Sequence, residues 1–173
     1  YFLKQSLEAA VSAAGPAYDF VLIDCPPALG LLTVNSLVAA QAVLVPLQCE
    51  FFALEGVSQL MQTIERVRGA FNAGLEIQGI VLTMFDQRNN LSGMVETDVR
   101  DHFGDKVYET VIPRNVRISE APSHGRPVLI YDTACAGSRA YLNLASEVIS
   151  RERQTQHRQA LARQGGGQPM GAS

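Results

Sequence analysis

The sequence is poor in cysteine and in long apolar runs, and each of these absences removes a class of protein. Its three cysteines, Cys25, Cys49 and Cys135, are odd in number and form no C-x-x-C pair. A disulfide framework or a zinc site is therefore not expected. No apolar run approaches the ~20 residues of a membrane span, and no signal-peptide pattern opens the sequence. We therefore expect a cytoplasmic protein that does not enter a membrane.

A strong excess of one charge is also absent. Fourteen lysines and arginines stand against 17 aspartates and glutamates, which gives a formal net charge of -3. This balance does not by itself indicate a nucleic-acid binder, so DNA binding would need a local basic patch or an assembled dimer. The 173 residues, 47% hydrophobic and 18% charged, are enough for one globular domain with a buried core.

The sequence does contain a strand followed by a stiff turn near its beginning. The apolar run Phe20–Ile23 is typical of a strand buried on both faces of a parallel sheet. Asp24 follows at the carboxyl end of this strand, where open α/β sheets bind their ligands. Pro26 and Pro27 end the strand, and Gly30 gives the turn freedom to move. A carboxylate placed in this way holds Mg²⁺ in nucleotide hydrolases, although an aspartate that only caps a turn fits the same pattern.

Apolar periodicity along the chain predicts alternating helices and strands. Alternation of this kind implies parallel βαβ units with right-handed crossovers, and therefore an α/β fold built on a partial doubly wound parallel sheet with flanking helices. The expected helices cover residues 1–14, 31–40, 54–71, 91–103, 117–124 and 137–149. The expected strands cover residues 20–23, 42–46, 76–84 and 107–112, with a brief extended piece at 127–131.

The composition changes after residue 150, so we expect one domain over residues 1–150 and a separate tail over 151–173. In the tail the apolar stripe stops, and residues 164–173 are rich in glycine and glutamine. We expect a frayed helix followed by disorder. A basic tail that touches DNA is the alternative, although charge runs are usually only solvated. The charged residues are Arg151, Arg153, Arg158 and Arg163 against Glu152.

A longer stretch carries a family resemblance. Residues 18–55 read YDFVLIDCPPALGLLTVNSLVAAQAVLVPLQCEFFALE, and this resembles the Walker B and switch II region of the ParA/Soj chromosome-partitioning ATPases, of the deviant Walker A, MinD-like class. The resemblance continues through GIVLTMFDQRNNL at 79–91 and HFGDKVYETVIPRNVRISEAPSHGRPVLIYD at 102–132 into the last predicted helix. It therefore covers most of the chain and implies a P-loop NTPase-like fold whose N-terminal part is missing.

The resemblance gives the strand and turn near the beginning a role. It implies that Asp24 lies in the outer coordination shell of Mg²⁺. The turn through Pro26, Pro27 and Gly30 then belongs to switch II, which senses the γ-phosphate of ATP. A loop of this kind is ordered by phosphate and metal contacts and is released after hydrolysis.

Two further turns are expected to complete a nucleotide crevice. Thr83–Asp86 ends the third predicted strand at the same edge of the sheet as Asp24, and the fourth strand ends at Pro113, Arg114 and Asn115. The resemblance implies contacts to the base around Met84 and the Pro113–Asn115 turn, largely through backbone and packing. Ordinary turn chemistry is the alternative explanation for these residues.

Arginines follow the same two strands. If the loops are neighbours, Arg88, Arg114 and Arg117 share one rim and can neutralise DNA phosphates without reading bases. The resemblance implies that Arg88 and Arg117 bind DNA in the ATP-bound dimer. The alternative is solvation or an ion pair with a carboxylate such as Glu120. The segment 132–137 is less basic than in many members of the family.

The resemblance implies an ATPase for DNA segregation, of chromosomes or plasmids, with ATP and Mg²⁺ as cofactors. Its ATP-bound homodimer would coat double-stranded DNA non-specifically on the nucleoid, and a ParB-type partner would stimulate hydrolysis. The sequence lacks the phosphate loop G-x-x-x-x-G-K-[ST], so we expect this chain alone to be inactive. The alternatives are a MinD-like membrane-positioning ATPase and a non-catalytic remnant that keeps the partner and DNA surfaces. Residues 151–163 contain only Leu161 as a large apolar residue, which does not favour membrane binding.

Overall fold

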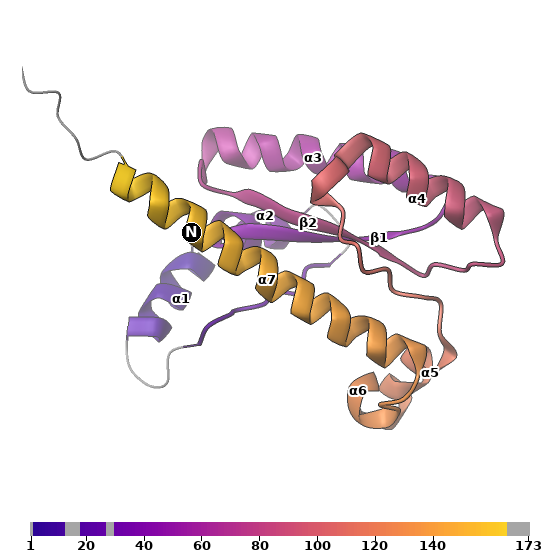
Figure 1. Ribbon diagram of the computed structural model, residues 1–173. Coiled ribbons are helices and arrows are strands. Elements are labelled where there is room, and N and C mark those ends of the chain that lie inside the picture. Colours follow the sequence, from indigo (N-terminus) through magenta and orange to yellow (C-terminus); the bar gives the residue numbers. More distant parts are fainter. Residues whose placement is uncertain (1, 13–17, 27–29, 166–173) are drawn as a thin grey trace, which may run out of the picture. The chain divides into compact units, whose positions relative to one another are not determined.

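The computed structural model describes residues 2–12, 18–26 and 30–165. The chain divides into two compact units. The first unit comprises residues 1–82 and 87–107, and the second comprises residues 83–86 and 108–173. The helices and strands of each unit are labelled in Figure 1.

The first unit is built around two parallel strands with flanking helices (Figure 1), which confirms the expected α/β class. The helices and strands predicted between residues 1 and 103 are confirmed apart from 20–23, with shifts of a few residues at their ends. In chain order the elements are α1 (Phe2–Ser12), α2 (Leu31–Ala39), β1 (Ala42–Gln48), α3 (Ala53–Ala70), β2 (Glu76–Thr83), α4 (Asn90–Phe103) and the 3₁₀ turn η1 (Gly104–Lys106).

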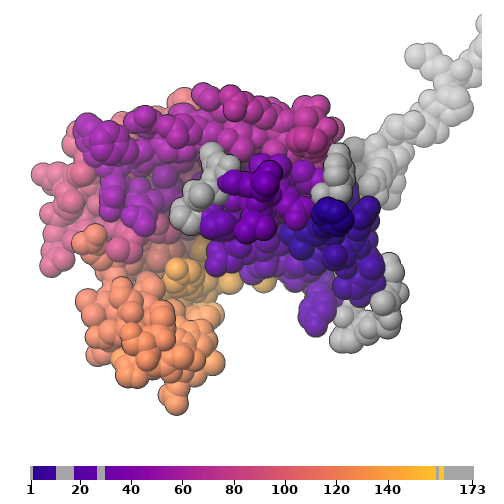
Figure 2. Space-filling view, turned by 180° about the vertical axis from the view of Figure 1, so that it is seen from behind, coloured from indigo at the N-terminus to yellow at the C-terminus, as the bar shows by residue number. Residues whose placement is uncertain are grey.

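The core of the first unit forms where α2 and α3 pack next to β1. The apolar residues of α3 recur every three or four positions, which places Val57, Ile64 and Val67 on one buried face. Leu37 and Val38 of α2 pack into the same cluster. α1 contacts α2, and Figure 2 shows these first helices side by side in indigo and violet.

Asn72 connects the end of α2 to the loop that follows α3. Its side-chain amide donates hydrogen bonds to the backbone oxygens of Leu37 at 3.0 Å and Ala40 at 2.8 Å. The last carbonyls of a helix have no partner within the helix, so a donor from another segment stabilises the helix end. This contact fixes the end of α2 next to the entry to β2.

The second unit consists of short helices at the start of one long helix. Its elements are α5 (Val116–Glu120), the 3₁₀ turn η2 (Ala121–His124), α6 (Val128–Tyr131) and α7 (Ala136–Gly165). The Glu147 carboxylate on α7 accepts hydrogen bonds from the backbone N–H groups of Glu109 at 2.9 Å and Thr110 at 3.0 Å. Arg151, one turn further along α7, pairs with Glu147 at 2.8 Å and lies 4.2 Å from the centre of the Tyr108 ring. α7 is thereby fixed onto the segment 108–110.

Two predicted strands are wrong. Residues 20–23 run without strand pairing, and Phe20, Val21 and Leu22 are exposed. Strand structure needs a hydrogen-bonded neighbour, and in the described part of the chain only β1 and β2 form a sheet. Residues 107–112 form no strand, because the N–H groups of Glu109 and Thr110 donate to Glu147 and not to a strand; isolated bridges join Val107 to Ile80 and the following Pro113 to Phe85.

Residues 128–131 are helical where we expected a brief extended piece. Pro127 precedes α6, whose first turn closes when Ile130 and Tyr131 donate their N–H groups to the Pro127 carbonyl. Residues 151–165, where we expected a frayed helix, continue α7. Side-chain pairs one turn apart stabilise this extension, including Arg151 with Glu147 and Gln156 with Glu152. Residues 166–173 lie outside the described residues.

No helix in the described ranges is long and apolar enough to cross a membrane.

Candidate functional site

Asp24 and Pro26 lie in the exposed segment before α2. The Asp24 side chain is exposed. The Cys25 thiol, its neighbour, donates to the backbone oxygen of Ile23 at 3.8 Å. Pro27 lies outside the described residues, so its proposed place in the switch is not tested.

Gly30 is the N-cap of α2, and its carbonyl accepts the N–H of Val34 at 3.0 Å. Any residue can adopt its φ of -91°, and a Cβ added there would meet nothing within 4 Å. The conformation of the described state therefore does not require glycine. Glycine would be required at position 30 only if the preceding turn moves, as it does in a switch.

The described residues contain no group of three or more His, Cys, Asp or Glu side chains that could hold a metal ion by themselves. Mg²⁺ commonly binds through one or two carboxylates and completes its shell with water and substrate phosphates. A single exposed carboxylate such as Asp24 fits that mode of binding, and it does not fit a metal site built only from protein ligands.

The structure brings the Met84 turn and the Pro113 turn together inside the second unit. Phe85 donates its N–H to the Ile112 carbonyl at 3.2 Å, and Arg114 donates its N–H to the Phe85 carbonyl at 2.9 Å. These bonds form the parallel bridge between Phe85 and Pro113. The two turns therefore lie next to each other, as expected from the sequence.

Met84 has a backbone φ of 54°, the only non-glycine residue among those described with a positive φ. A left-handed backbone costs energy in a residue with a side chain, and such residues cluster at ligand sites. Its side chain remains 38% exposed next to the bridge. Asn115, by contrast, uses its side-chain oxygen locally, because this oxygen accepts the Arg117 N–H at 2.9 Å and caps α5.

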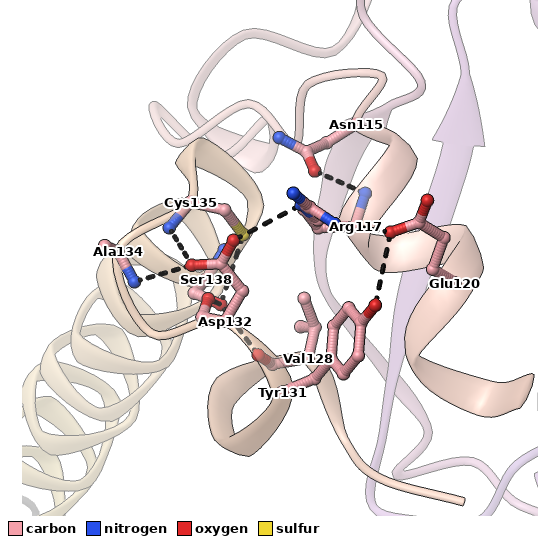
Figure 3. A network of polar contacts seen from close by, with 9 residues as sticks. All are labelled: Asn115, Arg117, Glu120, Val128, Tyr131, Asp132, Ala134, Cys135 and Ser138. Carbon is pink, nitrogen blue, oxygen red and sulfur yellow. Dashed lines mark hydrogen bonds and ion pairs between the residues drawn. The ribbon is translucent and has the colours of Figure 1, made fainter. Parts of the chain in front are cut away.

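Arg117 lies between two carboxylates in the second unit (Figure 3). Its guanidinium is 2.9 Å from Glu120 Oε2 and 3.4 Å from Asp132 Oδ2. The pKa of the Arg117 guanidinium is raised above its usual value. The hydrogen bond to Glu120 is the largest cause, and the charge of that carboxylate is the second. The alternative partner that the sequence offered for Arg117 is thus present in the structure.

The sequence reasoning missed the second carboxylate, Asp132, and the turn that holds it. Asp132 Oδ1 accepts the backbone N–H groups of Ala134 and Cys135 at 3.1 Å each (Figure 3). The Ser138 hydroxyl is 2.6 Å from the Asp132 backbone oxygen and 3.1 Å from that of Val128. An aspartate shortly before a helix is the sequence signal for such a turn.

Arg88 follows β2 and belongs to the first unit, whereas Arg114 and Arg117 belong to the second. Asp24 and Met84 are divided between the units in the same way. The common arginine rim and the complete nucleotide crevice therefore stay predictions.

Three comparisons relate the chain to known proteins. A family model described as an AAA domain matches residues 1–77. The chain is 68% identical over 160 residues to the chromosome partitioning protein ParA of Caulobacter vibrioides, which covers 92% of this chain and 59% of the relative. It is 52% identical over 148 residues to the chromosome-partitioning ATPase Soj of Treponema pallidum, which covers 86% of this chain and 58% of the relative.

Solved structures agree on the fold. Cobyrinic acid a,c-diamide synthase from Mycobacterium smegmatis matches 84% of this chain and 51% of its own, at 36% identity and a TM-score of 0.66. The same enzyme with a bound ATP analogue and magnesium matches 67% of this chain and 45% of its own, at 41% identity and a TM-score of 0.58. The cell division ATPase MinD from Pyrococcus furiosus matches 86% of this chain and 57% of its own, with a TM-score of 0.66 at 24% identity, which concerns the fold alone.

The chain spans somewhat more than half the length of the relatives that it matches. Over the matched residues, the chain is homologous to the ParA/Soj family of chromosome-partitioning proteins.

Proposed function

We propose that this protein is an ATPase that segregates DNA. The observation that carries the proposal is the 68% identity over 160 residues to a chromosome partitioning protein, because that match includes both candidate nucleotide turns and Arg117. ATP would drive a homodimer that binds double-stranded DNA without sequence preference. A ParB-type partner would stimulate hydrolysis and release the DNA.

In this proposal, each candidate site residue has a role toward ATP and Mg²⁺. Asp24 holds Mg²⁺ through water, and the turn through Pro26, Pro27 and Gly30 responds to the γ-phosphate. Met84, with Pro113, Arg114 and Asn115, contacts the base. Bound Mg·ATP supplies the phosphoryl group that is transferred to water. The exposure of Asp24 and the strained backbone of Met84 support these roles.

The distribution of charge supports a DNA surface on the second unit. This unit has eight arginines and six carboxylates, whereas the first unit has six lysines and arginines and 11 carboxylates. The second unit is therefore basic, although the net charge of the whole chain is slightly negative. Arg117 of this unit and Arg88 of the first unit would contact phosphates, which gives binding that weakens steeply with salt.

The test uses the full-length protein, meaning a gene product that carries a phosphate loop together with these residues. Arg88→Glu combined with Arg117→Glu should abolish DNA retention in the presence of ATP and leave ATP binding unchanged. If ATP binding is lost as well, the arginines have a structural or nucleotide role. Lys4→Glu with Arg66→Glu, a double charge reversal at exposed positions of α1 and α3, should leave DNA retention nearly unchanged.

The same preparation separates the alternatives. A MinD-like membrane-positioning ATPase would sediment with anionic liposomes in the presence of ATP, whereas we expect the protein to stay in solution. A non-catalytic remnant would bind DNA and partner without turnover. Because the 173 residues contain no G-x-x-x-x-G-K-[ST] loop, we expect them by themselves not to hydrolyse ATP.

A further inference from the structure

The Arg117 side chain is accessible to solvent and is already paired with two carboxylates. Its side chain is 53% exposed, and those of Glu120 and Asp132 are 41% and 32% exposed. A phosphate from solution can therefore reach the guanidinium, but it must compete with the two carboxylates that already contact it.

The two carboxylates are held in place by other groups. The Tyr131 hydroxyl lies 3.4 Å from Glu120 Oε2, on the ring that stacks on His124 at 4.9 Å. Asp132 is fixed through its other oxygen by the N–H groups of Ala134 and Cys135. Each carboxylate therefore has a partner other than Arg117.

The close contact between α5 and the start of α7 stabilises this arrangement. A Cβ added at Gly137 would lie 2.6 Å from Cδ1 and Cγ1 of Ile118, so the side chain of Ile118 packs directly against the backbone of α7. Arg117 and Ile118 are neighbours on α5, and Asp132 precedes α7 by a few residues. The packing therefore keeps Arg117 within reach of Asp132.

We propose that Glu120 and Asp132 form an anionic clamp that competes with DNA phosphate for Arg117 and so lowers the DNA affinity of the protein. This inference rests on the proposed function, in which Arg117 binds DNA. Phosphate and carboxylate present similar pairs of oxygens to a guanidinium, so one can replace the other without rearrangement of the helix.

The clamp tunes affinity and does not block it. Exposed ion pairs are weak, and breaking one costs a factor of about 1.4 to 5 in an equilibrium constant. Loss of one clamp carboxylate should therefore tighten DNA binding by up to about fivefold, and the upper part of this range, threefold to fivefold, is the effect expected for a clamp. The opposite arrangement, in which the carboxylates orient Arg117 toward DNA, would make the same loss weaken binding.

The experiment measures fluorescence anisotropy of a short non-specific duplex with the full-length protein, ATP and Mg²⁺. Glu120→Gln is the main variant, because it lies on exposed α5 and keeps the shape of the side chain. Asp132→Asn is the second variant and retains an oxygen for the two N–H donors. Glu152→Gln is the matched control, since it changes the charge of the same unit by the same amount and contacts Gln156.

We expect Glu120→Gln and Asp132→Asn to bind DNA about threefold to fivefold more tightly, and Glu152→Gln to bind less than twofold more tightly. The slope of log K against log salt should stay nearly the same, because Arg117 neutralises the same phosphate in the complexes of the wild type and the clamp variants. In an Arg117→Ala background, Glu120→Gln should have no more effect than the control.

Two outcomes overturn the inference alone. If the wild-type protein binds DNA and Glu120→Gln matches Glu152→Gln, the charge acts only at long range and there is no clamp. If Glu120→Gln weakens binding, the carboxylate orients Arg117. Absence of DNA binding in the wild type and in every variant overturns both the clamp and the proposed function.

Discussion

The carboxylate of Glu147 accepts a hydrogen bond from the backbone N–H of Thr110 at 3.0 Å, across 37 residues of sequence. Together with the bond to Glu109, this contact satisfies two donors that a neighbouring strand would otherwise use. It connects α7 to the segment that carries the Pro113 turn, and so links the long helix to a candidate nucleotide-binding residue.

Glu147→Ala should destabilise the second unit by about 1–3 kcal/mol, because two backbone donors lose their acceptor and Arg151 loses its partner. Hydrogen exchange is the measurement, since the amides of Glu109 and Thr110 should lose protection. Glu152→Ala, one turn further along α7, removes only a bond to Gln156 and should leave both amides protected. Unchanged protection in Glu147→Ala would show that the contact is incidental.

The same contact predicts that the free energy of unfolding depends on pH. Burial alone would raise the pKa of Glu147, but the N–H donors of Thr110 and Glu109 and the charge of Arg151 outweigh it and lower the pKa below its usual 4.5. A carboxyl whose pKa is depressed by folding stabilises the protein above its unfolded pKa, and this stabilisation is lost as the pH falls through the folded value. The difference in unfolding free energy between wild type and Glu147→Gln should therefore be constant at neutral pH and shrink below 4.5. A difference that stays constant or grows in acid would contradict this.

Asn72→Ala should destabilise the first unit by about 1–3 kcal/mol, because carbonyls at the end of α2 lose a shared donor. Asn72→Asp should destabilise the unit more than Asn72→Ala at neutral pH, since a carboxylate would face the backbone oxygens of Leu37 and Ala40. Urea denaturation gives both values. Equal stability of wild type and Asn72→Asp would rule out the amide as the donor.

Gly137→Ala should destabilise by about 1–3 kcal/mol, because the added methyl overlaps the side chain of Ile118. Truncation of that side chain in the Gly137→Ala, Ile118→Ala double variant should cost less than the sum of the two changes. Gly69→Ala in α3 is the matched control, since the new methyl meets nothing within 4 Å. It should stabilise by about 0.5–1 kcal/mol, and a similar gain in Gly137→Ala would contradict the close packing.

Local patterns predicted the parts of the fold that depend on local interactions. The spacing of Val57, Ile64 and Val67 predicted α3, and the apolar run 42–46 predicted β1. The strand at 107–112 was mispredicted because Glu147, which takes its donors, lies far along the sequence. For Arg117, Glu120 lies three residues away on the same helix and was a foreseeable partner. Asp132 was not foreseeable, because a turn and the packing of Ile118 bring it close.

The central claim is that Asp24 serves ATP hydrolysis, and its most direct test is ATP turnover by the full-length protein with DNA and a ParB-type partner present. Asp24→Ala should reduce turnover to background, because Mg²⁺ loses the carboxylate that orders its water. Asp19→Ala, an exposed aspartate in the same segment, should turn over ATP like the wild type. Turnover by Asp24→Ala at the wild-type rate would remove Asp24 from the mechanism and contradict the account.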